Sequence, residues 1–164
     1  MPEETPKGPD AIGKLELEAR LASFDARAAR EEKILEDIET LFKEVDGLIP
    51  QLPPMSSDEP ITDAQHNAQE GIIERYNAFY QLGQLMLFEN MEIKEGQSFL
   101  DVPFTLYEGK VDDLETLTKA GIITPQQRIE RTASQMTRSS RMVAGYHRWG
   151  QIMFAHREQI YRKS

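Results

Sequence analysis

The stretch from Thr124 to Lys163 contains no proline after Pro125 and repeats apolar residues at helical spacing. It therefore predicts one long, uninterrupted α-helix. Thr124 suits the N-cap, Pro125 suits the first helical position, and Gln127 completes a capping box. A helix of this length extends about 55 Å. It needs neighbours of similar length, so the chain is expected to form a rod of long helices.

Two apolar stripes follow this helix on different faces. The first runs along its whole length: Ile129, Ala133, Met136, Ser140, Val143, His147, Gly150, Phe154 and Tyr161. The second occupies the C-terminal half alone: Met142, Tyr146, Trp149, Met153 and Ile160. A helix with two apolar faces must be covered from both sides. We therefore expect the C-terminal half to be either the most enclosed part of the protein or its contact with a partner.

A second long helix is predicted near the N-terminus by a heptad pattern typical of coiled coils. Its seam consists of Leu17, Leu21, Phe24, Ala28, Glu31, Leu35, Ile38, Phe42, Val45 and Ile49. Glu31 is the one charged residue on this seam. Two interpretations remain open for Glu31: a device that sets the helix register, or a surface side chain whose carboxylate reaches solvent.

The remaining segments complete an all-α architecture. We predict an elongated antiparallel bundle of three long, coiled-coil-like helices plus one short helix and an ordered apolar connector, all in one domain over 11–164. The expected segments are a flexible tail (1–10), helix (11–49), proline-rich linker (50–61), helix (62–91), connector (92–109), short helix (111–120) and helix (125–162).

The two helices with a second apolar face supply the candidate residues for a partner interface. A three-helix rod has little interior, and apolar surface on two faces of a helix exceeds what it can bury. The candidates are Leu82, Leu85, Phe88, Met142, Tyr146, Trp149, Met153 and Ile160.

Acidic and basic residues are distributed unevenly along the chain. Through Gly121 there are 11 basic and 26 acidic residues (net −15), and after it 8 basic and 2 acidic residues (net +6). Within the basic segment, Arg131, Arg138, Arg141 and Arg148 lie on one helical face, roughly opposite the first apolar stripe. These arginines either pair with the acidic first helix or bind an external anionic surface such as nucleic acid or an acidic membrane.

Several classes of function find no support in the residues. The chain has no cysteine, which excludes disulfides, thiolate metal sites and cysteine nucleophiles. No Glu-x-x-His pair of a di-iron bundle occurs, and the glycines at 145 and 150 lack the Lys-Ser/Thr of a phosphate loop. No secretory signal or membrane-spanning run is recognisable. We expect no enzyme activity, no cofactor and no metal, and an intracellular, cytoplasmic location.

These observations favour a non-catalytic structural or adaptor subunit that contacts other protein chains, of its own or another kind, through helix–helix packing. The alternative is a binding module for an anionic surface that uses the basic C-terminal helix.

Overall fold

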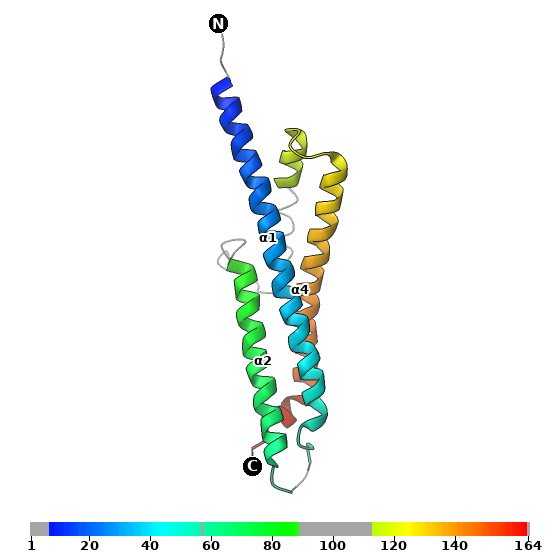
Figure 1. The fold of residues 1–164 in the computed structure, drawn as a ribbon. Coiled ribbons are helices and arrows are strands. Elements are labelled where there is room, and N and C mark those ends of the chain that lie inside the picture. The colour runs from blue at the N-terminus through cyan, green and yellow to red at the C-terminus, as the bar shows by residue number, and fades with distance from the viewer. Residues whose placement is uncertain (1–6, 57, 89–112, 164) are drawn as a thin grey trace, which may run out of the picture.

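The computed structural model describes residues 7–56, 58–88 and 113–163, and the side chains of all these except 7–12, 87 and 88. Three long helices, α1 (Lys7–Leu48), α2 (Asp63–Phe88) and α4 (Pro125–Ile160), form an elongated bundle (Figure 1). A 3-10 turn, η2 (Ile49–Gln51), follows α1, and a short helix occupies 113–119. No strand occurs among the described residues. The predicted all-α bundle is confirmed.

Contacts between the helices define their directions. Arg75 of α2 contacts Glu44, and Gly71 lies against Leu48, so α2 runs antiparallel to α1. The side chain of Gln69 reaches the backbone of Gln159, and Gly83 lies against Tyr146, so α2 is also antiparallel to α4. Consequently α1 and α4 run in the same direction and α2 runs alongside them in the opposite one, as Figure 1 shows.

The helix starts agree closely with the capping signals. Thr124 and Gln127 form both hydrogen bonds of the capping box, and Pro125 occupies the first turn of α4, as predicted. The short helix ends at Gly121, whose φ of 74° is the left-handed conformation of a helix C-cap. There Ile122 N–H donates to the carbonyl of Leu117, as in a Schellman motif.

The described ends of the long helices lie within two residues of the predicted ones, except at the start of α1 and at the last described residue of α2. Helix α1 begins at Lys7 and not at residue 11, so the last part of the predicted tail is helical. The predicted helix 62–91 is described as far as Phe88. The predicted connector 92–109 lies outside the described residues.

The apolar interior has two parts. The larger lies among α1, α2 and α4 and contains buried residues from Ile34 to Ile160. The smaller lies where α2 is absent, and consists of Phe24, Leu114, Leu117 and Ile123 with Leu17, Leu21 and Ile122 packed on it. The short helix thus covers the N-terminal part of α1, as α2 covers the C-terminal part.

Candidate functional site

The basic face of α4 lies against α1. All four arginines on that face pair with α1 carboxylates: Arg131 with Asp25, Arg138 with Glu31, Arg141 with Glu32 and Glu39, and Arg148 with Asp46. Arg131 does so with two parallel hydrogen bonds of 3.0 and 2.9 Å. The bonds to Asp25 also raise the pKa of Arg131. An external anion would have to compete with these carboxylates for the same guanidinium groups.

One of these pairs is buried. Glu31 is 1% exposed and Arg138 is 5% exposed, and Arg138 Nε donates to Glu31 Oε1 over 2.9 Å. Arg138 also donates to Gln135 Oε1 over 2.8 Å and to the hydroxyl of Ser134. Because Glu31 is buried, the interpretation of it as a solvent-reaching surface residue is wrong. A polar group held between the two apolar parts of the interior instead suits a role in setting the register of α4 on α1.

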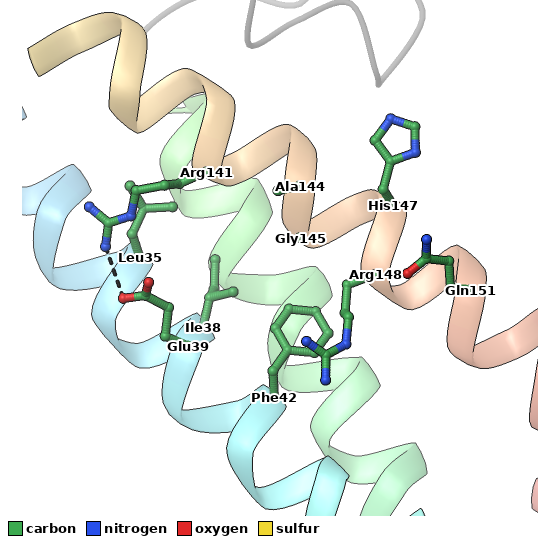
Figure 2. Close-up of a pocket in the computed structure, with 10 residues that line it drawn as sticks. All are labelled: Leu35, Ile38, Glu39, Phe42, Arg141, Ala144, Gly145, His147, Arg148 and Gln151. Carbon is green, nitrogen blue, oxygen red and sulfur yellow. Dashed lines mark hydrogen bonds and ion pairs between the residues drawn. The ribbon is translucent and has the colours of Figure 1, made fainter. Parts of the chain in front are cut away.

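A groove follows the line between α1 and α4 (Figure 2). Leu35, Ile38 and Phe42 form its apolar floor, and the Arg148 guanidinium carbon lies 5.4 Å from the centroid of the Phe42 ring. Figure 2 shows Arg141 bonded to Glu39 across the groove. The groove lining contains no serine, threonine or cysteine, so it holds no hydroxyl or thiol nucleophile.

Most candidates for a partner interface lie inside the monomer. Met142, Trp149 and Ile160 are buried in the larger part of the interior, and Leu82, Tyr146 and Met153 are half-buried against it. Leu85 is 54% exposed. The side chain of Phe88 lies outside the described residues. The second stripe therefore packs the chain against itself, and among the described candidates only Leu85 offers substantial surface.

Trp149 is the centre of an aromatic cluster that joins the three long helices. Its ring centroid lies 5.3 Å from those of Phe42 and Tyr76 and 5.9 Å from that of Phe79. The buried indole N–H has no hydrogen-bond partner among the described residues. A neighbouring cavity of about 250 Å³ is lined by aromatic residues, glycine and methionine, with no carboxylate, imidazole or cationic side chain. Three of the residues that line it are tyrosines.

The first apolar stripe of α4, in contrast, faces away from the bundle. Phe154 is 94% exposed, Ile129 61% and Met136 52%. Small residues at Ala133 and Gly150 are exposed between them. We call this surface the outer face of α4, consisting of Ile129, Ala133, Met136, Ser140, Val143, Ala144, His147, Gly150 and Phe154. It contains no Asp, Glu, Lys or Arg in a chain that is 29% charged.

Sequence reasoning found this stripe but did not assign it to the surface. A signal was available, because the four arginines lie roughly opposite the stripe and point toward acidic α1. Once the arginines are paired with α1, the stripe must point away from α1.

The described residues show no arrangement suited to a metal or to hydrolysis. No group of three or more His, Cys, Asp or Glu side chains in this part of the chain is placed to hold a metal ion. His66 contacts Glu70 at 3.3 Å on the surface of α2, and His156 bonds to Gln159 one turn later in α4. A local helical contact thus accounts for His66 and for His156, whereas His147 is exposed beside the groove between α1 and α4.

The chain matches no protein-family model, no curated protein and no solved structure. None of the described helices carries an apolar stretch of the length that a membrane span requires.

Proposed function

We propose that this protein is a non-catalytic structural or adaptor subunit, and that it contacts another protein chain through the outer face of α4. The observation that carries the proposal is the exposure of large apolar side chains along a helix face without charges. Fully exposed phenylalanine is unusual on a monomer surface, and contiguous apolar surface marks sites of interaction. Depletion of charge is the compositional signature of an interface centre.

The length of the outer face supports a helix–helix contact. From Ile129 to Phe154 the face extends about 40 Å along one uninterrupted helix. Among the described residues, α1 and α2 lie on the other sides of α4 and the short helix lies beside its first turns, so a partner helix can lie along the face without moving them. An intracellular setting belongs to the same proposal and is supported by the absence of cysteine.

The anionic-surface alternative has weaker support. Its four arginines are already bonded to α1 carboxylates, so binding would require these ion pairs to break. No specific observation favours it over protein contact.

A photo-crosslinking amino acid placed at Ser140, on the outer face, tests the proposal in an extract of the cells that make the protein. We expect an adduct of defined mass, and we expect Phe154→Asp to abolish it. The matched control places the crosslinker at Lys33, on the exposed side of α1, with Leu15→Asp as the control substitution, since Leu15 is exposed on the same helix. Circular dichroism verifies that each variant is folded.

Absence of an adduct from position 140 would refute the proposal. So would an adduct that forms equally well from position 33, or that survives Phe154→Asp.

A further inference from the structure

We propose that the partner on the outer face of α4 is a second copy of the same chain, with the two α4 helices antiparallel about a two-fold axis beside Val143 and Ala144. This inference rests on the proposed function, because it assigns an occupant to the same face. The argument comes from the order of large and small residues along the face and from the charges at its ends.

In an antiparallel pair with this axis, residues whose numbers sum to about 287 lie opposite each other. Phe154 then faces Ala133 of the second copy, and Met136 faces Gly150. His147 faces Ser140, and Val143 faces Ala144. Phe154, Met136 and His147 each meet a small residue, which allows two helices to approach closely. Ile129 lies opposite Glu158.

The surface of the monomer has hollows where this register needs them. One recess lies at Ala133, between α4 and Thr118 of the short helix, and is bordered by Pro125, Arg128, Ile129, Thr132 and Met136. Another lies at Gly150 and is bordered by Tyr146, His147, Gln151 and Phe154. The first recess receives Phe154 of the second copy, and the second receives Met136. A parallel pair would place Phe154 against Phe154 and leave both recesses empty.

Charged residues just beyond the two ends of the outer face agree with the same register. Arg128 and Glu158 sum to 286, so each lies near the other across the interface, once at each end. A closed two-fold pair makes every contact twice and covers the outer face of α4 on both copies. A parallel pair would instead bring Glu158 beside Glu158 and Arg128 beside Arg128.

The size of the contact sets the expected strength. From Arg128 to Glu158, the strip is about 45 Å long and about 11 Å wide, and it covers about 500 Å² on each copy, or about 1,000 Å² in total. That is near the lower limit for a specific interface. A reversible dimer is therefore expected, with a dissociation constant in the micromolar range and not a permanent one.

Disulfide trapping is a direct test because the natural chain has no cysteine. Ala144→Cys lies beside the axis and should form a disulfide-linked dimer under mild oxidation. Ala133→Cys alone and Phe154→Cys alone should not, whereas a mixture of these two variants should form a linked dimer. Sedimentation of the unmodified chain from about 1 to about 200 µM should show a monomer–dimer equilibrium. Phe154→Asp should weaken the dimer about 30-fold or more.

Three results would overturn the proposal. The first is a monomer over the whole concentration range without trapping at Ala144→Cys. The second is trapping of every single-cysteine variant with itself, which indicates a parallel pair. The third is a dimer that Phe154→Asp leaves unchanged.

The mass of the photo-crosslinked adduct from position 140 shows whether only the self-pairing is wrong or whether the proposed function is wrong as well. An adduct of twice the chain mass supports the second copy. An adduct of another mass, lost with Phe154→Asp, retains the subunit function and overturns the self-pairing. No adduct overturns both.

Discussion

Replacing the buried pair Glu31–Arg138 tests how α4 is aligned on α1. Arg138→Met removes the guanidinium that bonds to Glu31 at 2.9 Å and leaves a carboxylate that is 1% exposed without this ion pair. Breaking one side of a buried pair is expected to lower the free energy of unfolding by about 3–5 kcal/mol. Gln135 also loses its hydrogen bond from Arg138, which adds to the loss.

Replacing both partners should have a much smaller effect. In Glu31→Leu/Arg138→Met, apolar side chains of similar length replace two charged groups that are buried away from water. Such replacements are often neutral, or stabilising by about 1–4 kcal/mol. The two single variants and the double variant therefore form a cycle with a large coupling energy between Glu31 and Arg138. The exposed pair Arg131–Asp25 provides the control, since surface pairs contribute about 0–1 kcal/mol.

Urea unfolding followed by circular dichroism and by Trp149 fluorescence measures each free energy. Trp149 lies in the larger part of the interior, so its emission reports on the bundle itself. The reasoning would be refuted if Arg138→Met lowered the stability by less than about 1 kcal/mol, the range of a surface pair. It would also be refuted if the double variant were as unstable as the single ones, because the pair would then contribute more than it costs to bury.

Two further predictions concern the packing around α4. Trp149→Ala should lower the free energy of unfolding by about 3–5 kcal/mol, as should Phe42→Ala, because both rings lie in the same aromatic cluster. Urea unfolding measures both variants. A loss below about 1 kcal/mol for Trp149→Ala would contradict the burial of this side chain. Gly83→Ala should destabilise by about 1–3 kcal/mol, since its new Cβ would lie 2.6 Å from the Tyr146 hydroxyl. In Gly47→Ala, the new Cβ meets no atom within 4 Å, so this variant should be neutral or stabilise by up to about 1 kcal/mol. Equal thermal midpoints for the two glycine variants would show that the Tyr146 side chain moves away from position 83 without cost.

The helices themselves could be predicted from the sequence because their signals are local. Apolar spacing and capping residues act within a few turns, and the Thr124 capping box is present as expected. The first residue of α1 was harder to predict. Gly8 and Pro9 suggested a tail, yet both are within α1, where a proline in the first turn lacks only an N–H that would have had no partner.

Whether each apolar face packs inside the bundle or lies at its surface could not be predicted from one helix alone. Tyr146 and Trp149 looked suited to a partner, whereas they pack on Phe42, Tyr76 and Phe79 of the other two helices. Which face is covered depends on where α1 and α2 lie around α4. That arrangement is a property of the whole bundle, and helical periodicity reports only that a face is apolar.

Charge supplies the information that periodicity lacks. The arginines of α4 and the carboxylates of α1 are separated by a nearly constant interval along the chain, from Arg131–Asp25 to Arg148–Asp46, so they define a parallel alignment of the two helices. That alignment turns the second stripe toward α2 and leaves Phe154 and Met136 in solvent. The same ion pairs that occupy the basic face thus create the exposed apolar one. Weakening them should therefore alter both the fold and any association through the outer face of α4, whereas Phe154→Asp should alter association alone.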